Sequence, residues 1–444
     1  MQLGDITEPK IDQSGPPESG EFIYVDISSV DNQTKRVADP KQLSADAAPS
    51  RARQRLRAGD VLVSMTRPNL NAVAIVPPEL DGAVGSTGFH VLRTGGAALP
   101  RWLYYHVQSP QFVRAMSELV QGALYPAVRP RDIRAFETSL PDLDEQRRIV
   151  AEIEKQFSRL DEAVSNLMRV KVNLKRYKAA VLRAAVEGRL VPTEAELARR
   201  ERRSYETGAD LLHRILELRR TGRSKYSEPP PPETANLGSL PEGWVYATAE
   251  QITEQGRPIT YGVIKLGENV EGGVPILRSS DVRRLKLDLR RVKSISPKIA
   301  ASFRRTFLCG GEIVVTVRGT LGGVAVVPLS CRGFNISREV AMLALVLPEM
   351  AHAVASFIGS GPIERWLLSR TKGIAYTGIN IETLRALPIP VPPLAEQLRI
   401  IADLERRMSF LNAVEAEVDI GLHRASTLRE SALSSAFRIS EAIG

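Results

Sequence analysis

The amino-acid sequence predicts an α+β protein with an internal pseudo-twofold duplication, in which two long antiparallel coiled-coil helices separate two β-rich α/β globular parts. Three observations lead to this prediction. The second half of the chain repeats the first at an offset of 251 residues, apolar residues recur every seven positions after residue 141, and short β-branched runs precede each helical stretch. A period near 250 residues is too long for a solenoid, so the repeated element is a whole two-part unit.

The repeat is clearest where the helical stretches begin. The segment that starts at Pro141 returns at Pro392, and ten of the twenty positions of 141–160 are identical in the two copies. Upstream, the matches are single residues within short similar segments. These matching pairs are Arg67 with Arg318, Gly122 with Gly373, Tyr125 with Tyr376, and Arg134 with Arg385. The duplication therefore extends into the globular parts, which have diverged more than the helices.

The helical stretches carry a seven-residue apolar seam, which is typical of a helix that pairs with another helix. Asp144 and Glu145 mark a helix start and Gly188 marks its end, so a helix over 144–187 would be about 66 Å long. The duplication favours packing of the two helices on each other over separate docking on the globular parts. The seam residues that we single out are Ile153, Leu160, Leu167 and Leu174, followed by Leu404, Leu411 and Val418 in the second copy.

The globular parts read as β-rich with short helices. Runs at 60–66 and 73–76 are separated by Pro68 and Asn69 and predict strand, turn and strand, and 312–317 with 324–327 repeat the pattern. Residues 102–113 and 363–369 predict helices. The expected organisation is a first globular domain over 1–140, a central helical region with a basic linker over 141–239, a second globular domain over 240–388 and a C-terminal helix over 389–444.

Composition bounds the class of protein. Hydrophobic residues make up 43% and charged residues 25% of the 444 positions, which is ordinary for a globular chain, and the formal net charge is +9. The positive excess fits a nucleic-acid partner without proving one. Two cysteines rule out a disulfide-stapled fold. The start lacks an apolar signal region and the longest apolar run cannot span a bilayer, so we expect a cytoplasmic protein with no membrane contact.

Motifs for catalysis and for cofactor binding are missing from the sequence. It contains no phosphate-binding loop, no glycine-rich dinucleotide motif after a strand and no Asn/Asp-Pro-Pro-Tyr/Phe segment of amino-methyltransferases. The glycines of 319–323 read as a turn, and Cys309 and Cys331 have no clustered histidines to form a zinc site with them. The sequence therefore predicts a binding protein with no catalytic, cofactor-binding or metal-ligating residue of its own.

Basic residues cluster before the strand–turn–strand pattern in both halves, as in a surface that contacts phosphates. Nine stand between positions 282 and 305, and Arg51, Arg53, Arg55 and Arg57 lie in the equivalent region of the first half. A merely solvated face is about equally probable for any one of them. The candidate DNA-binding residues are Lys35, Arg36, Arg67, Asn69, Asn71, Tyr125 and Arg129 in the first half, and Arg283, Arg284, Lys286, Arg318, Thr320, Lys372, Tyr376 and Asn380 in the second.

The duplication also suggests how to sort these candidates. Residues common to both halves cannot distinguish two different DNA sequences, so they would serve the scaffold or the phosphates. Residues that differ, such as Arg129 opposite Asn380, could read bases, because Arg can bind guanine and Asn can bind adenine through two hydrogen bonds. Ordinary turn chemistry after Pro68 competes with base reading at Asn69 and is the more probable of the two interpretations.

Four segments together resemble the specificity subunit of type I restriction-modification enzymes. They are Ser139-Leu-Pro-Asp-Leu-Asp-Glu-Gln146, Ile389-Pro-Val-Pro-Pro-Leu-Ala-Glu-Gln397, Ala184-Ala-Val-Glu-Gly-Arg-Leu-Val-Pro192 and Arg429-Glu-Ser-Ala-Leu-Ser-Ser-Ala-Phe437. The resemblance covers nearly the full chain, with two small departures, at 142–144 and at Val186, where the family usually has Phe.

The resemblance implies a division of labour. Each globular part would be a target recognition domain that reads one half of a bipartite, asymmetric site in double-stranded DNA. The paired helices would fix the gap between the half-sites and dock two methyltransferase subunits, which bring S-adenosylmethionine. Two restriction subunits that use ATP and magnesium would complete the restriction complex.

Two other classes of function remain open at this point. A self-contained DNA methyltransferase or nuclease would bind S-adenosylmethionine or carry catalytic motifs, and the sequence shows none of the latter. A coiled-coil adaptor whose globular parts bind protein would show salt-insensitive DNA binding or none.

Overall fold

A computed structural model describes residues 1–120, 126–221, 226–234, 237–319, 321–370 and 378–442. The chain divides into two compact units. Unit 1 comprises Met1–Lys171 with Ala416–Gly444, and unit 2 comprises Val172–Glu415. Each unit contains one globular part and a portion of both long helices. Within the described ranges, no helix has an apolar stretch long enough to cross a membrane.

Unit 1 is built from two small sheets, a hairpin and three helices. The first sheet has the order β4 (Lys41–Ser44), β1 (Glu21–Val25), β8 (Val84–Ser86) and β5 (Ala52–Arg55). The second has the order β7 (Val73–Ile75), β6 (Val61–Ser64) and β9 (Phe89–Leu92), and β2 (Val30–Asp31) pairs with β3 (Arg36–Val37). The helices are α1 (Pro100–His106), α2 (Pro110–Glu118) and α3 (Pro130–Arg134).

The strand β6 shows why this sequence forms a central strand. All four of its residues are buried. Val61 and Val63 point into a cluster with residues of α1 and α2, whereas Leu62 points into a cluster on the other face of the sheet. Because side chains alternate between the two faces, a strand covered on both sides is mostly apolar, as residues 61–63 are. Its antiparallel ladder to β7 confirms the predicted strand, turn and strand.

The prediction of one helix over 102–113 is wrong, because the chain forms two helices there. Helix α1 ends at His106, and Ser109 begins α2 by accepting a hydrogen bond on its side chain from the backbone N–H of Phe112 (3.3 Å). Pro110 at the first position of α2 has no N–H to continue the preceding helix.

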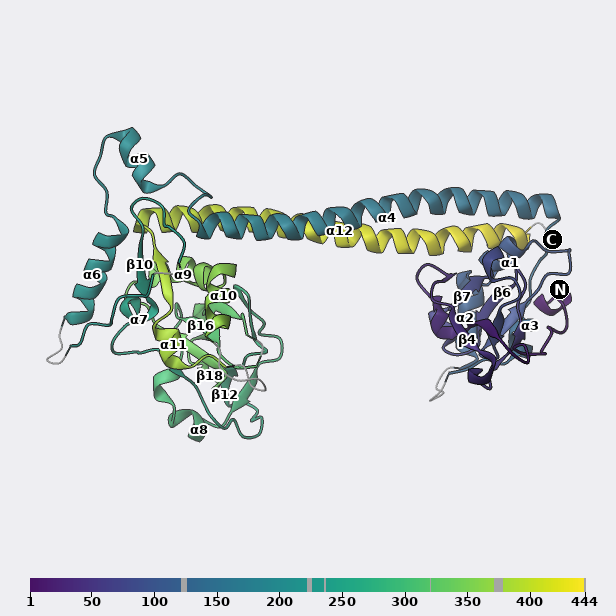
Figure 1. Cartoon of the computed structure of the whole chain (residues 1–444), viewed down its shortest axis with the longest axis horizontal. Helices are drawn as coiled ribbons and strands as arrows, with labels where there is room; N and C mark the ends of the chain where they lie inside the picture. Colours follow the sequence, from purple (N-terminus) through teal and green to yellow (C-terminus); the bar gives the residue numbers. More distant parts are fainter. Residues whose placement is uncertain (121–125, 222–225, 235–236, 320, 371–377, 443–444) are drawn as a thin grey trace. The chain divides into compact units, whose positions relative to one another are not determined.

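Unit 2 repeats this architecture with additions. One sheet has the order β15 (Lys293–Ile295), β12 (Val274–Leu277) and β18 (Asn335–Ile336). A second has the order β11 (Thr260–Tyr261), β19 (Val340–Leu343), β16 (Ile313–Thr316) and β17 (Val324–Val326). In addition, β13 (Val282–Arg283) pairs with β14 (Lys286–Leu287), and β10 (Val245–Thr248) pairs with β20 (Pro388–Val391). Its shorter helices are α5 (Glu194–Glu201), α6 (Gly208–Arg220), α7 (Ala249–Ile252), α8 (Pro297–Ala301), α9 (Ala351–Ile358), α10 (Gly361–Ser369) and α11 (Ile381–Arg385). Figure 1 shows α9 and α10 beside β16 in unit 2, and α1 and α2 beside β6 and β7 in unit 1.

The two units share their strand pairings. β1 pairs in parallel with β8 in unit 1, and β12 pairs in parallel with β18 in unit 2. The strands β6 and β16 each lie between two antiparallel neighbours in equivalent registers, Val61 opposite Leu92 and Ile313 opposite Leu343. The duplication read from the sequence is therefore a duplication of the fold.

The long helices α4 (Leu143–Val186) and α12 (Leu394–Ala442) run antiparallel. In unit 1, the Lys171 ammonium lies 2.7 Å from Asp419, and Arg429 pairs with Asp161. In unit 2, Lys178 lies 2.6 Å from Glu415. The predicted seam residues Ile153, Leu174, Leu404, Leu411 and Val418 are buried, and Leu160 and Leu167 are half-buried. A coiled-coil seam of this kind confirms the predicted pairing.

Helix α4 ends where the sequence predicts. Gly188 has a φ of +67°, a left-handed conformation that suits glycine. The backbone N–H of Arg189 donates to the carbonyl of Ala184 at 2.8 Å, which satisfies a carbonyl of the last turn. A Cβ at Gly188 would also lie 2.6 Å from the ring of Pro241.

In unit 2, a buried polar network fastens the segment after α4 to the first turn of α12. The carboxylate of Glu396 accepts hydrogen bonds from the backbone N–H of Glu194 (2.7 Å) and from the indole N–H of Trp244 (2.9 Å). The carboxylate of Glu194 in turn pairs with Arg203 and Arg399, at 2.5 and 2.6 Å. The network holds α5 against α12, because each buried carboxylate finds its donors there.

Candidate nucleic-acid interface

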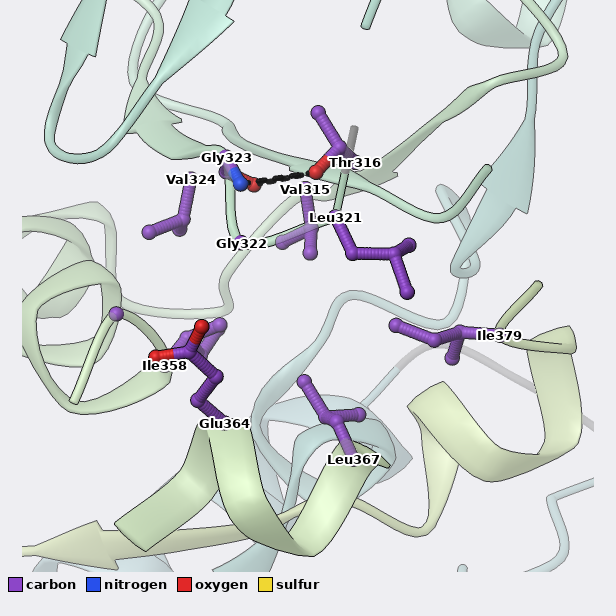
Figure 2. Close-up of a pocket in the computed structure, with 11 residues that line it drawn as sticks. Val315, Thr316, Leu321, Gly322, Gly323, Val324, Ile358, Glu364, Leu367 and Ile379 are labelled. Atoms are coloured by element: carbon purple, nitrogen blue, oxygen red, sulfur yellow. Dashed lines mark hydrogen bonds between the residues drawn. The ribbon is translucent and has the colours of Figure 1, made fainter. Parts of the chain in front are cut away.

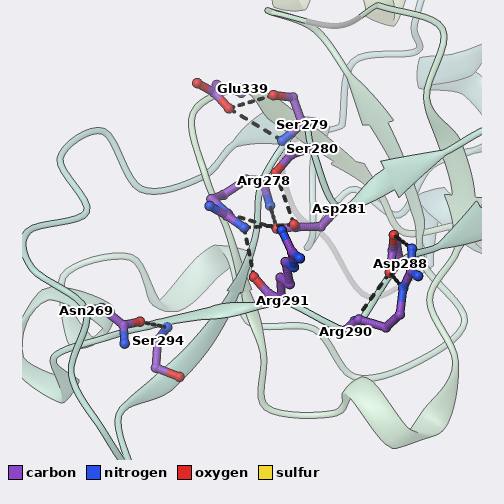
Figure 3. A network of polar contacts seen from close by, with 10 residues as sticks. All are labelled: Asn269, Arg278, Ser279, Ser280, Asp281, Asp288, Arg290, Arg291, Ser294 and Glu339. Atoms are coloured by element: carbon purple, nitrogen blue, oxygen red, sulfur yellow. Dashed lines mark hydrogen bonds and ion pairs between the residues drawn. The ribbon is translucent and has the colours of Figure 1, made fainter. Parts of the chain in front are cut away.

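The β13–β14 hairpin lies within the predicted basic cluster of unit 2, and Figure 3 shows ion pairs of Arg290 from this cluster and of Arg278, which precedes it. Arg278 forms two hydrogen bonds with Asp281 and donates to the carbonyl of Arg291 at 2.9 Å. Arg290 pairs with Asp288 at 2.6 Å, and this hydrogen bond holds the pKa of the Asp288 carboxyl well below its usual range. These arginines shape the loop instead of offering free charge.

The three candidates on the hairpin itself have different surroundings. Arg284 donates to the carbonyl of Gly359, between α9 and α10, so it has a structural contact. Arg283 and Lys286 are exposed, and neither forms an ion pair with a carboxylate of the described residues. Lys286 also lines a groove of about 820 Å³ beside Lys175 of α4 and Arg365 of α10.

A second concave surface of unit 2 gathers arginines from distant parts of the chain. We call it the basic hollow. It has a volume of about 750 Å³ and is lined by residues 260–262, 264, 301–306, 318 and 338. Its four arginines, Arg304, Arg305, Arg318 and Arg338, are exposed, and no carboxylate of the described chain pairs with them. Unpaired guanidinium groups in a concavity attract a polyanion such as DNA.

The floor of the basic hollow is rigid. A Cβ on Gly262 would lie 1.7 Å from the carbonyl oxygen of Ile336, so only glycine lets the two backbones approach this closely. The guanidinium of Arg318 lies 5.6 Å from the centre of the Tyr261 ring, within cation–π range. The hydroxyl of Tyr261 donates to the carbonyl of Ile379 at 2.8 Å, and burial raises the pKa of this hydroxyl. Arg318 is thus held at the edge of the hollow.

In unit 1, two of the predicted DNA contacts, Lys35 and Asn71, make hydrogen bonds within the chain. Lys35 donates from its ammonium group to the carbonyl of Asn71, and burial lowers the pKa of Lys35 to about 8. Asn71 adopts a left-handed φ of +45°, and its side chain donates to the carbonyl of Val107 at 2.9 Å. These contacts fix the turn between β6 and β7, so turn chemistry accounts for Asn71.

The remaining candidates of unit 1 stay available to a ligand. Arg36, Arg67, Asn69 and Arg129 are exposed. Arg67 has a left-handed φ of +49°, and its backbone N–H donates to the carbonyl of Pro126 at 2.9 Å, so the backbone is fixed while the side chain faces solvent. Arg67 occupies the position equivalent to Arg318.

Asn380 of unit 2 has a local structural role. Its side chain accepts a hydrogen bond from the backbone N–H of Thr383 at 2.6 Å and caps the N-terminus of α11. At the equivalent position Arg129 has no side-chain cap, and its backbone N–H donates to the Asp132 carboxylate instead. Tyr125, Thr320, Lys372 and Tyr376 lie outside the described residues.

Sequence reasoning missed Tyr261 and Arg338 of the basic hollow, because they stand far from the basic clusters along the chain. Arg338 lies between two buried strand segments, Asn335–Ile336 and Val340–Leu343. Its neighbours Ser337 and Glu339 are polar as well, so the sequence around it carries no signal that singles it out.

The described part of the glycine-rich segment, Gly319 with residues 321–323, includes the predicted turn. It joins β16 to β17, and the backbone N–H of Gly323 donates to the hydroxyl of Thr316 at 2.9 Å. Figure 2 shows the apolar pocket beside it, where Val315, Leu367 and Ile379 converge and Glu364 stands at the side. Among the described residues, no group of His, Cys, Asp or Glu is arranged to hold a metal ion.

Comparison with known proteins points to one family. No protein-family model matches the chain. The specificity subunit of the type I restriction enzyme EcoBI from Escherichia coli is 25% identical over 339 residues, which cover 76% of this chain and 64% of that protein. The EcoDI specificity subunit, also from Escherichia coli, is 22% identical over 338 residues, covering 73% and 67%. The chain thus spans just under two thirds of the EcoBI subunit.

Two solved structures share the fold over nearly the whole chain. One, from work on the complex assembly and conformational transition of a type I restriction-modification system, has a TM-score of 0.72 at 24% identity and covers 98% of this chain and 96% of the other. The HsdS subunit from Thermoanaerobacter tengcongensis has a TM-score of 0.55 at 24% identity, with coverages of 99% and 96%. In sequence the chain is thus similar to specificity subunits of type I restriction enzymes, and it shares its fold with these two solved structures.

Proposed function

We propose that this chain is the non-catalytic DNA sequence-specificity subunit of a type I restriction-modification complex. Residues 1–140 and 240–388 are its two target recognition domains, and each reads one half of a bipartite, asymmetric site in double-stranded DNA. Residues 141–239 and 389–444 supply the helices. The protein acts in the cytoplasm.

One observation carries this proposal: the same fold occurs twice, with a shared arginine at equivalent exposed positions and different residues around it. Arg67 and Arg318 occupy the same place after β6 and β16, whereas Asn69 and Arg129 have no identical counterpart. A protein that reads two different half-sites needs a common way to hold phosphates and separate ways to read bases. A duplicated fold with diverged surfaces meets both needs.

The helices support the proposed spacing role. A helix of 44 residues such as α4 is about 66 Å long, and half-sites one DNA turn apart have centres about 34 Å apart. The helices thus exceed the length that such a spacer needs.

The helices also offer a surface for two methyltransferase subunits. Seam residues such as Leu174 and Leu411 are covered within the helix pair, so we assign docking to the apolar side chains that face outward. These are Met168, Val170, Val172 and Tyr177 on α4, and Leu398, Phe410, Ile420 and Leu428 on α12. Large exposed apolar side chains are typical of protein–protein contacts. S-adenosylmethionine belongs to the methyltransferase subunits, and ATP and magnesium belong to restriction subunits where the complex includes them.

A domain exchange tests the proposal. Residues 1–140 are replaced by the equivalent domain of another specificity subunit, and methylated positions are mapped in DNA from cells that express the complex. We expect one half-site to change while the other stays the same. A change in both half-sites, or in neither, would contradict modular reading.

A matched insertion tests the spacing role. One heptad is added to α4 near 170–180 and one to the facing part of α12, so that the apolar seam stays continuous. We expect the gap between half-sites to lengthen while both half-sites keep their sequences. An unchanged gap would exclude the helices as the spacer.

A further inference from the structure

Arg338 stands apart from the other arginines of the basic hollow when the two units are aligned. Arg318 has its counterpart in Arg67, and 304–305 fall in the segment that aligns with Arg51 and Arg53. At the position of Arg338, by contrast, unit 1 has Thr87, which follows β8 as Arg338 follows β18. The hollow thus combines basic residues common to both units with one arginine that only unit 2 possesses.

The backbone at Arg338 is held firmly while its side chain stays free. The backbone N–H of Arg338 donates to the carbonyl of Val263 at 2.8 Å, and that of the preceding Ser337 donates to Leu277 at 2.9 Å. Ser337 is 2% exposed and Val340 is fully buried. Arg338 itself is exposed and lines the hollow, and its guanidinium has no carboxylate partner among the described residues. Because the backbone is already fixed, only the side chain has to become ordered on binding, which lowers the entropy cost of a specific contact.

We propose that Arg338 reads a guanine in the half-site bound by unit 2, while Arg318 holds the DNA backbone. This inference rests on the proposed function. Arg can donate two parallel hydrogen bonds to O6 and N7 of guanine in the major groove, a geometry that no other base presents. Arg318 is common to both units, and its guanidinium lies over the ring of Tyr261. It therefore suits a phosphate contact, which carries no sequence information.

The comparison with unit 1 strengthens this assignment. The hydroxyl of Thr87 can form single hydrogen bonds with any of several bases and cannot form the two-bond pair with guanine. Unit 1 is therefore expected to lack the guanine preference at the equivalent base pair. The difference between Arg338 and Thr87 then accounts for part of the asymmetry of the site.

The experiment uses the full chain with its methyltransferase subunits and a double-stranded DNA library in which each base pair of the site is varied. Bound DNA is sequenced at several salt concentrations. For Arg338→Ala we expect the preference for guanine at one base pair of one half-site to fall about 5- to 150-fold, with other positions and the salt dependence nearly unchanged. For Arg338→Gln we expect the preference at that base pair to move toward adenine.

Two further variants separate base reading from charge and from folding. Arg318→Ala should weaken binding to all sequences alike and lower the salt slope by about one. Arg332→Ala removes an exposed arginine outside the hollow and should leave the profile unchanged. If Arg338→Ala is poorly folded, Arg338→Gln serves in its place, because its amide cannot donate to both O6 and N7 of guanine as Arg does and the guanine preference should still fall.

The outcomes distinguish failure of the base-reading role of Arg338 from failure of the proposed function. Uniform weakening by Arg338→Ala, or an unchanged profile, would overturn the base-reading role and leave the proposed function standing. A wild-type complex without any bipartite sequence preference would overturn the proposed function itself, and this inference with it. Loss confined to one guanine supports both.

Discussion

The helix that packs against the central strand carries different core residues in the two units. In unit 1, Trp102 and His106 of α1 stack with ring centres 4.8 Å apart, and Phe437 of α12 lies 4.8 Å from His106. At the equivalent positions α9 of unit 2 has Ala353 and Phe357, and both are buried. The backbone pairings of the two units nevertheless agree, so the fold tolerates this exchange.

Segments outside the repeat explain how the exchange is accommodated. In unit 2, the ring of Trp244 lies 5.8 Å from that of Phe357. Trp244 precedes β10, in a stretch that has no counterpart before the first strand of unit 1. A core requires filled volume more than a particular residue, so each unit fills the same space from a different part of the chain. Repeated sequence thus predicts shared strand pairing better than shared core residues.

The largest difference that we expect between the units is in how their stability falls at acidic pH. Burial lowers the pKa of His106 to about 4, and neither ring nitrogen has a hydrogen-bond partner among the residues that the structure describes. His106 is neutral in the folded state, whereas an unfolded chain takes up a proton below about pH 6.5. The stability of unit 1 is therefore complete above pH 6.5 and falls on acidification toward pH 4, by about 2 kcal/mol at pH 5 for this residue.

Hydrogen exchange of β6 amides in unit 1, followed between pH 6.5 and 5 and corrected for intrinsic rates, measures this loss. His106→Phe, the residue that unit 2 uses, should remove the part of the pH dependence that His106 causes. The variant should keep a pH dependence of similar size that comes from His90, because burial also lowers the pKa of His90 to about 4. His213→Gln, at an exposed position of unit 2, is the control. An identical pH slope in wild type and His106→Phe would contradict the prediction.

A smaller difference is expected at the first turns of the long helices. Glu145 and Glu396 are equivalent residues, but Glu145 pairs with Arg148 at the surface, whereas Glu396 is fully buried and accepts two hydrogen bonds. Glu396→Gln places an amide NH₂ where one of these donors needs an acceptor, so it should destabilise unit 2 by about 1.5 kcal/mol. Glu145→Gln should change stability by less than about 0.5 kcal/mol.

Chemical denaturation of the two variants, followed by the fluorescence of Trp244, measures this contrast. Equal effects of Glu145→Gln and Glu396→Gln would show that the buried network does not stabilise the attachment of α5. Since Trp244 donates directly to Glu396, a shift of its emission in Glu396→Gln before unfolding would report local loosening.

Patterns that are local or periodic were predictable from the sequence, and assemblies of distant residues were not. The seven-residue seam predicted a helix over 144–187, and α4 spans Leu143–Val186. The break between α1 and α2 was missed although Ser109 and Pro110 signal it, because apolar periodicity continues across it. The basic hollow escaped prediction for another reason: its arginines come from three separate segments, and only folding brings them together.

Two candidate DNA contacts in unit 1 show what residue type alone does not predict. Lys35 and Asn71 are a basic and a polar residue near a turn, which is a fair description of a DNA contact in sequence terms. In the folded chain the Lys35 ammonium donates to the carbonyl of Asn71, and the Asn71 amide donates to the carbonyl of Val107, which the sequence does not reveal. Composition indicates which residues can bind phosphate, but it does not show which of them the scaffold already occupies.

The smallest effect that we predict separates capping from base reading at Asn380. Asn380→Ala should destabilise α11 by about 1 kcal/mol, because the N–H of Thr383 loses its acceptor, whereas Arg129→Ala at the equivalent position should leave the stability of α3 nearly unchanged. Asn380→Asp keeps the acceptor and adds a charge that suits a helix N-terminus, so stability should recover. Thermal unfolding ranks the variants, and methylation mapping shows whether the DNA site changes. If Asn380→Asp restores stability but alters one half-site, Asn380 also contacts a base, and capping alone does not explain why unit 2 has Asn where unit 1 has Arg.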